Sequence, residues 1–186
     1  MKNHYRYIWI ASFLVMLLFS ACAMIPKGVQ PIRDFDADRY LGKWYEIVRV
    51  DNRFEKNLQR VTAQYHLDDD GSLIVLNRGY DTVKNEWKSA KGKAKFRSQK
   101  TTAALKVSFF GPFYGGYNVI ALDPAYRYAL VAGQNFDYLW ILSRDTTIPE
   151  DIKASFIKTA QAIGYDTSRF VWVAHDKEIG VGDEEK

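Results

Sequence analysis

The chain has 186 residues, which is enough for one domain with a sizeable core, and aromatic residues make up 15% of it. The formal net charge is +4, and half of it comes from Lys2 and Arg6 near the N-terminus. A balance so close to neutral gives no electrostatic footprint for a polyanion, so we expect no nucleic-acid partner.

The first 21 residues have the layout of a signal peptide. Lys2 and Arg6 precede an apolar run, residues 7–19, which is too short to cross a membrane comfortably. The single cysteine, Cys22, follows this run and has no partner for an internal disulfide. These features predict cleavage before Cys22 and export of the rest of the chain.

Leu18-Phe19-Ser20-Ala21-Cys22 resembles the lipobox of bacterial lipoproteins, in which the cysteine is lipidated and becomes the first residue. Phe19 departs from the pattern, because a smaller aliphatic residue is usual there. An ordinary secretory signal and an uncleaved anchor stay open as alternatives. Ala23 stands where an aspartate would signal inner-membrane retention, so the resemblance implies lipidation of Cys22 and attachment to the outer membrane at its periplasmic face.

Residues 22–33 read as a tether, because Pro26, Gly28 and Pro31 prevent regular structure there. A short helical turn capped by an aspartate is expected after residue 34. We therefore expect a folded domain over residues 34–175 and a polar tail over residues 176–186. No internal repeat or second domain is visible.

Alternation of apolar and polar residues predicts a series of strands joined by short connections, and residues 86–97 show the clearest period of two. Such a series forms an up-and-down antiparallel barrel or a sandwich. The expected strands are residues 44–50, 60–67, 72–80, 86–97, 103–109, 117–122, 127–132 and 137–143. A helix beginning near Pro149 and ending at Gly164 has one apolar face, so it should pack outside the barrel. Residues 170–173 are a candidate ninth strand.

Three short motifs resemble those of the lipocalin family. Gly42-Lys43-Trp44-Tyr45 resembles its Gly-x-Trp motif, residues 122–126 resemble its second motif, and Leu142-Ser143-Arg144 resembles the arginine that closes its last strand. Residues 108–123 and 137–144 further resemble the lipoprotein lipocalins of bacterial outer membranes. The resemblance implies an all-β, eight-stranded lipocalin (calycin) barrel that stores or transports lipid for envelope maintenance under stress.

Up-and-down connectivity places the three motifs at one end of the barrel. If residues 44–50 run upward from Trp44, the last strand descends and delivers Arg144 beside it. An indole face attracts a guanidinium, so we expect these two side chains to stack and close the barrel together with Gly42 and Asp123. The opposite end stays open. Glu46 shares the inward parity of Trp44, and a lone buried carboxylate there would need a partner.

An eight-stranded barrel holds one small ligand, and the inward faces of these strands are apolar. One acyl chain of about sixteen carbons gains on the order of 10 kcal/mol on burial, before the costs of association. A fatty acid or a lysophospholipid is therefore the expected ligand. The expected lining residues are Val48, Tyr65, Phe96, Val107, Phe109, Tyr117, Val119, Tyr138 and Trp140.

Other functions stay open. A tetrapyrrole, a quinone or a similar hydrophobe is the alternative ligand, and Arg53, Lys56 and Lys84 in the open-end loops are candidates to meet a phosphate or carboxylate. Phe113 and Tyr114 are candidate contacts for a homodimer. We expect neither an enzyme nor a metal or cofactor, because after signal removal only His66 and His175 remain and neither has an obvious serine or metal-ligand partner.

Overall fold

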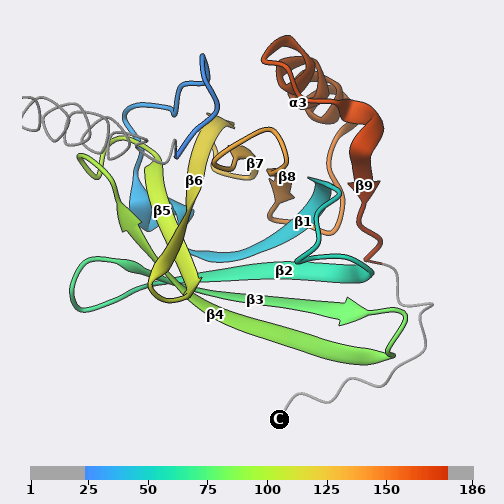
Figure 1. Ribbon diagram of the computed structural model, residues 1–186. Helices are drawn as coiled ribbons and strands as arrows, with labels where there is room; N and C mark the ends of the chain where they lie inside the picture. Colours follow the sequence, from blue (N-terminus) through green and yellow to red (C-terminus); the bar gives the residue numbers. More distant parts are fainter. Residues whose placement is uncertain (1–23, 176–186) are drawn as a thin grey trace, which may run out of the picture.

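Eight antiparallel strands curl into a closed barrel in the computed structural model, which describes residues 24–175 (Figure 1). Neighbouring strands pair in the order β2-β3-β4-β5-β6-β7-β8-β1, and a β1–β2 pairing completes the circle. The expected all-β, up-and-down barrel is confirmed. The strands are β1 (Gly42–Val50), β2 (Leu58–Leu67), β3 (Leu73–Asp81), β4 (Glu86–Phe96), β5 (Ala104–Phe110), β6 (Phe113–Leu122), β7 (Tyr128–Ala132) and β8 (Leu139–Ser143).

Strand β6 begins four residues earlier than the sequence predicts. Gly115 and Gly116 were expected to lie in a turn, but they pair with β5 opposite Val107 and Lys106. Gly116 is needed in the strand, because a Cβ there would lie only 1.8 Å from the carbonyl oxygen of Met24. A close approach of two backbones therefore explains why a glycine stands inside this strand.

A β-bulge interrupts β1 where the strand pairs with β8, between Glu46 and Val48. Trp44 and Glu46 face the interior before the bulge, and Arg49 faces it afterwards, where it contacts Glu46. The extra residue reverses the alternation of faces. Val48, expected inside from the parity of Trp44, instead packs in a cluster on the outer side of the wall.

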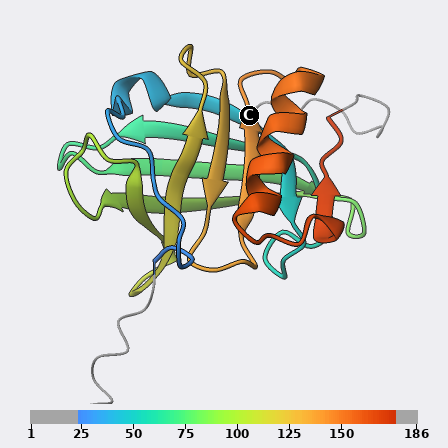
Figure 2. The same cartoon turned by 90° about the horizontal axis from the view of Figure 1, so that it is seen from above.

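A helix covers this outer cluster. Helix α3 (Glu150–Ala162) packs Phe156 and Ala160 against Val48 and against the outward residues of β7 and β8 (Figure 2). Glu150 and Asp151 lie in its first turn, where acidic side chains complement the helix dipole. The predicted helix outside the barrel is thus present.

The chain returns to the barrel through η2 (Thr167–Arg169) and β9 (Phe170–Trp172), which pairs with β1. Beyond β9, the backbone N–H of Val173 donates to the carbonyl of Ile47, and the N–H of Arg60 donates to the carbonyl of Ala174. The last described residues therefore bridge β1 and the beginning of β2, where those two strands have separated.

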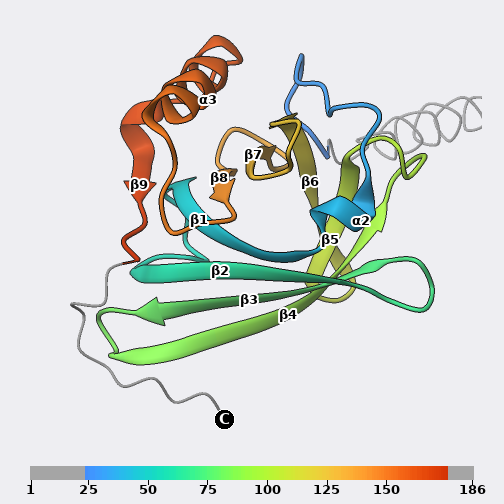
Figure 3. The same cartoon turned by 180° about the vertical axis from the view of Figure 1, so that it is seen from behind.

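Residues 24–35 run along the outside of the barrel toward α2 (Ala37–Tyr40), which lies at the Trp44 end (Figure 3). The side-chain amide of Asn118 donates to the Met24 carbonyl at 2.8 Å, and the N–H of Ile32 donates to the Val119 carbonyl at 2.9 Å. The part of the predicted tether that the structure describes is therefore packed on the wall. Cys22, the signal segment 1–21 and the tail 176–186 lie outside the described residues.

Candidate functional site

The floor of the barrel is built around Trp44, which is fully buried at the first inward position of β1. The guanidinium carbon of Arg144 lies 3.9 Å from the centroid of the indole. Arg144 also donates hydrogen bonds to three backbone carbonyl oxygens at 2.8 to 3.2 Å. The indole N–H donates to the carbonyl of Tyr40 at 2.9 Å. One end of the barrel is thereby closed.

Gly42 and Asp123 lie at the same end. Gly42 has φ +91°, a left-handed conformation that suits glycine, and a Cβ there would lie 3.4 Å from the Arg144 guanidinium. The Asp123 carboxylate accepts backbone hydrogen bonds from Ala125, Arg127 and Tyr128, which fixes the turn from β6 to β7. The four residues expected to close the barrel are brought together by the fold.

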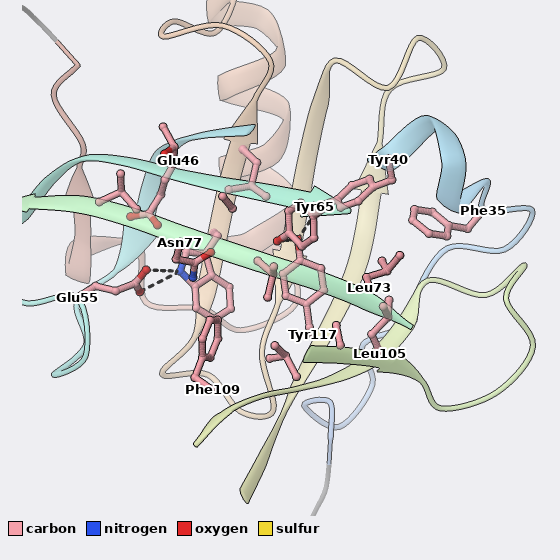
Figure 4. Close-up of a pocket in the computed structure, with 18 residues that line it drawn as sticks. Phe35, Tyr40, Glu46, Glu55, Tyr65, Leu73, Asn77, Leu105, Phe109 and Tyr117 are labelled. Atoms are coloured by element: carbon pink, nitrogen blue, oxygen red, sulfur yellow. Dashed lines mark hydrogen bonds between the residues drawn. The ribbon is translucent and has the colours of Figure 1, made fainter. Parts of the chain in front are cut away.

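Above this floor lies an apolar cavity in which the centre of a water molecule can occupy about 80 Å³ (Figure 4). Five of the predicted lining residues bound it: Tyr65, Val107, Phe109, Tyr117 and Trp140. The apolar residues that sequence reasoning missed are Phe35, Tyr40, Val61, Ala63, Leu73, Val75, Ala94, Leu105 and Leu142.

The other four predicted lining residues lie elsewhere. Phe96 and Val119 pack in the interior cluster around Trp44, beside the cavity and outside its lining. Tyr138 stacks on Trp140, with ring centroids 6.2 Å apart, and does not bound the cavity. Val48 faces the cluster under α3, as the bulge requires.

Three tyrosine hydroxyls meet in the cavity wall. The hydroxyl of Tyr65 donates to that of Tyr117 at 2.8 Å, and the hydroxyls of Tyr40 and Tyr117 are 2.7 Å apart. Burial raises the pKa of all three groups, so they are neutral at physiological pH. Two hydrogen bonds use two of the three hydroxyl protons, which leaves one proton for an acceptor in the cavity.

A buried ionic group lies on the open side of these tyrosines. Arg49 donates to a Glu46 carboxylate oxygen at 2.9 Å, and to the backbone carbonyls of Glu55 and Leu58. Arg49 is thus the partner that an inward Glu46 requires. The indole N–H of Trp140 donates to the Glu55 carboxylate at 3.0 Å. Both carboxyl groups point toward the cavity in Figure 4.

The pKa of Glu46 is raised well above its ordinary value. Burial is the main cause, the nearby Glu55 carboxylate adds to it, and the charge of Arg49 opposes it. A buried carboxyl group with a raised pKa, paired with Arg49, therefore lies beside a largely apolar wall of the cavity.

The remaining candidates lie away from the cavity. His66 is exposed on β2, and a ring nitrogen of His175 lies 2.8 Å from the backbone oxygen of Glu46. Arg53, Lys56 and Lys84 are exposed in the open-end loops. Within residues 24–175, no three His, Cys, Asp or Glu side chains form a cluster that could hold a metal ion, and no helix is long and apolar enough to cross a membrane.

A closed antiparallel barrel with one sealed end and an apolar cavity defines a class of small-ligand-binding proteins. The family described as lipocalin-like domain matches residues 35–175, and the chain belongs to this family. It is 55% identical over 163 residues to outer membrane lipoprotein Blc of Escherichia coli K12, which covers 88% of this chain and 91% of the relative. It is 48% identical to Blc of Vibrio cholerae, covering 88% of this chain and 97% of the relative.

The similarity to these relatives confirms the lipid-anchored location in the outer membrane that the N-terminal sequence predicts. Insecticyanin of the tobacco hornworm has the same fold, with a TM-score of 0.66 and 19% identity, covering 82% of this chain and 87% of that one. Lobster apocrustacyanin A1 gives a TM-score of 0.61 at 19% identity, covering 83% and 94%. Similarity at this level of identity concerns the fold alone.

Proposed function

We propose that this lipocalin stores or carries a fatty acid or a lysophospholipid for envelope maintenance under stress. The acyl chain would lie in the barrel with the polar head at the open end, and a lipid on Cys22 would hold the protein on the periplasmic face of the outer membrane. The observation that supports this proposal best is the apolar cavity between the Trp44–Arg144 floor and the open-end loops.

The size of the cavity favours one acyl chain. Pockets for small ligands commonly occupy about 300–1,000 Å³, whereas the space free to the centre of a water molecule here is about 80 Å³. A chain therefore has to displace side chains from the cavity as it enters. A second chain would require far more displacement in a barrel of eight strands.

The test is to extract the purified protein and identify its lipid by mass spectrometry, and then to titrate lipid-free protein with palmitate and with a lysophospholipid. Trp140 lines the cavity, so its fluorescence should change saturably. Val107→Phe narrows the cavity and should abolish this response, whereas Leu76→Phe, on the exposed face of β3, should leave it intact. No saturable response to either lipid would contradict the proposal.

A second ligand class is favoured by the tyrosine hydroxyls. One of the three tyrosine hydroxyls can still donate a hydrogen bond to a carbonyl or carboxylate oxygen. A quinone or a tetrapyrrole carries such an oxygen, whereas the methyl end of an acyl chain lacks one. Purified protein that is coloured and releases such a compound on extraction would favour this alternative.

We infer a carrier and not an enzyme. The two histidines that remain after signal removal, His66 and His175, do not line the cavity, and His66 is exposed on β2. Hydrolysis of a lipid ester that disappears in His66→Ala would overturn this inference. Pairing of two copies through Phe113 and Tyr114 is the further alternative, and it is tested together with the proposal that follows.

A further inference from the structure

Large apolar side chains are exposed on all four loops at the open end of the barrel. Phe54 lies in the β1–β2 loop and Val83 in the β3–β4 loop, with 60% and 69% of their surfaces exposed. Phe110 and Phe113 flank the β5–β6 turn at 72% and 78%. Phe136 in the β7–β8 loop and Tyr114 complete the set. We call these six residues the apolar rim.

The closed end has a different surface. Its connections, residues 68–72, 97–103 and 123–127, consist mainly of Asp, Ser, Thr, Lys and Arg, and only Leu67 beside them is a large exposed apolar residue among those described. Exposed apolar residues scattered over a surface need no explanation, but one on every loop of the same end is a concentration that the closed end lacks. Glu55 of the β1–β2 loop and Phe109, next to Phe110, line the cavity, so the apolar rim lies near its mouth.

Basic side chains accompany the rim. The Arg53 guanidinium lies 4.7 Å from the ring centroid of Phe54, the Lys106 ammonium lies 4.9 Å from that of Tyr114, and Lys84 follows Val83 in the chain. None of these three cations takes part in an ion pair among residues 24–175.

Several carboxylates at this end are already occupied. Asp137 pairs with Arg169, Asp81 pairs with Lys88, and Glu55 turns inward to Trp140. Among the described residues of this end, the exposed acids without an ion pair are then Asp51, Glu86 and Asp166, which follows Tyr165 beside the β7–β8 loop. Aromatic rings with neighbouring cations are typical of side chains placed at the boundary between lipid headgroups and acyl chains.

The N-terminal segment also begins at the open end. The Met24 carbonyl is held by Asn118 and lies against Gly116, near the upper end of β6. Cys22, the lipidated residue under the proposed function, precedes Met24 by two residues. Two residues span at most about 7 Å, so the lipid on Cys22 holds this end of the barrel at the bilayer surface.

We propose that the open end of the barrel docks on the bilayer. The apolar rim enters the boundary between headgroups and acyl chains, and Arg53, Lys84 and Lys106 meet the phosphates of anionic lipids. The cavity mouth then faces the membrane, and a single-chain lipid passes between bilayer and barrel without crossing water. This passage rests on the proposed ligand, and the tether rests on the proposed lipidation of Cys22, whereas the apolar rim and its cations are observed in the structure.

Fluorescent labels on the full lipidated chain test the docking. Lipidation consumes the thiol of Cys22, so Phe113→Cys at the rim and Asp69→Cys at the closed end each provide one labelling site. In vesicles of phosphatidylethanolamine and phosphatidylglycerol, a polarity-sensitive label at 113 should shift to the blue and be quenched by brominated acyl chains, while one at 69 should do neither. Equal quenching of both labels by aqueous iodide would overturn the proposal. So would a shift at 113 that follows the protein-to-lipid ratio, because it would assign the rim to contact between copies.

Transfer kinetics separate the docking from the ligand. In the variant that combines Phe54→Ser with Phe113→Ser, uptake of lysophospholipid from vesicles should slow by about tenfold or more, because two rings no longer enter the boundary. Binding of the same lipid added as monomers should be unchanged, and Leu76→Ser should change neither. Unchanged uptake with intact monomer binding would refute the docking. Failure of wild-type protein to bind the monomer would refute the proposed function and leave the label experiment standing.

Discussion

The guanidinium of Arg144 lies 3.9 Å from the indole centroid of Trp44, although 100 positions separate the two residues in the sequence. The contact joins the first strand of the barrel to the end of the last one. Arg144 adds hydrogen bonds to backbone carbonyls of Arg39, Lys43 and Tyr126, so it ties three separate segments to the floor. One side chain thus stabilises both the closure of the sheet and the seal of its end.

Replacement of Arg144 by lysine should destabilise the protein. Lysine keeps the charge but loses the planar fork that reaches three carbonyls and stacks on Trp44. We expect the free energy of unfolding to fall by about 2 kcal/mol, measured by urea denaturation. Arg127→Lys, at an exposed ion pair with Asp145 of the same end, should change it little. Equal effects of the two substitutions would contradict a special role for Arg144.

Stability should depend on pH through Glu46. Its pKa is raised in the folded state above the ordinary 4.5, so folding favours the protonated carboxyl. The stabilisation from this group is complete below about pH 4.5 and is lost as the pH rises through the raised value. Glu55→Gln removes one cause of the shift and should lower the pKa of Glu46, as followed by the carboxyl carbon in NMR titrations. An unchanged titration of Glu46 in that variant would show that Glu55 does not act on it.

Tyr117 should matter more for stability than either tyrosine it contacts. Tyr117→Phe removes the hydroxyl that both Tyr40 and Tyr65 bond to, and leaves their two hydroxyls buried without this partner. Each unsatisfied hydroxyl should lower the free energy of unfolding by about 1–3 kcal/mol. Tyr65→Phe removes one hydrogen bond and its donor together, so we expect a loss of only about 1 kcal/mol. Thermal unfolding of the two variants gives the comparison, and an equal loss would refute the role of Tyr117 as the hub.

Two adjacent glycines give a matched test of the packed N-terminal segment. A Cβ on Gly116 would collide with the backbone of Met24, whereas on Gly115 its nearest neighbour is the side chain of Gln134 at 3.9 Å. Gly116→Ala should release residues near Met24 and speed hydrogen exchange at Val29, while Gly115→Ala should not. The loss in stability for Gly116→Ala should be about 1–3 kcal/mol. Identical exchange in both variants would mean that this segment is not held at β6.

The sequence was sufficient for the barrel and its floor, because strand alternation and the residues of the three motifs are local signals. It was insufficient for the side of the wall that each residue faces. Alternation from Trp44 correctly places Glu46 inside the barrel, but the bulge after Glu46 reverses the faces of the residues that follow. A polar Arg49 between Val48 and Val50 was the one sign in the sequence that the pattern changes here. Both faces of β3 are apolar, so alternation could not select between Val75, in the cavity, and Leu76, outside.

Strand periodicity could not predict how the segment before β1, residues 24–41, contributes to the cavity either. Phe35 and Tyr40 line the cavity from outside the eight strands, and their position depends on the path of residues 24–35 along the wall. A cavity formed by the strands and this segment together is a product of tertiary packing. Period counting assigns residues to faces of a strand and gives no information on such segments.

The bridge made by residues 170–174 between β1 and β2 has a consequence for when the protein can fold during its synthesis. Two of the strands that pair with β1, β8 and β9, lie near the C-terminal end of the described chain. The backbone hydrogen bond from Arg60 to Ala174 likewise requires residue 174 to be present. Pairing over such separations is slow, since a long loop must be closed before any contact rewards it. Almost the entire polypeptide must therefore be synthesised before the barrel can close. The chain stays unfolded until then, which suits export to another compartment.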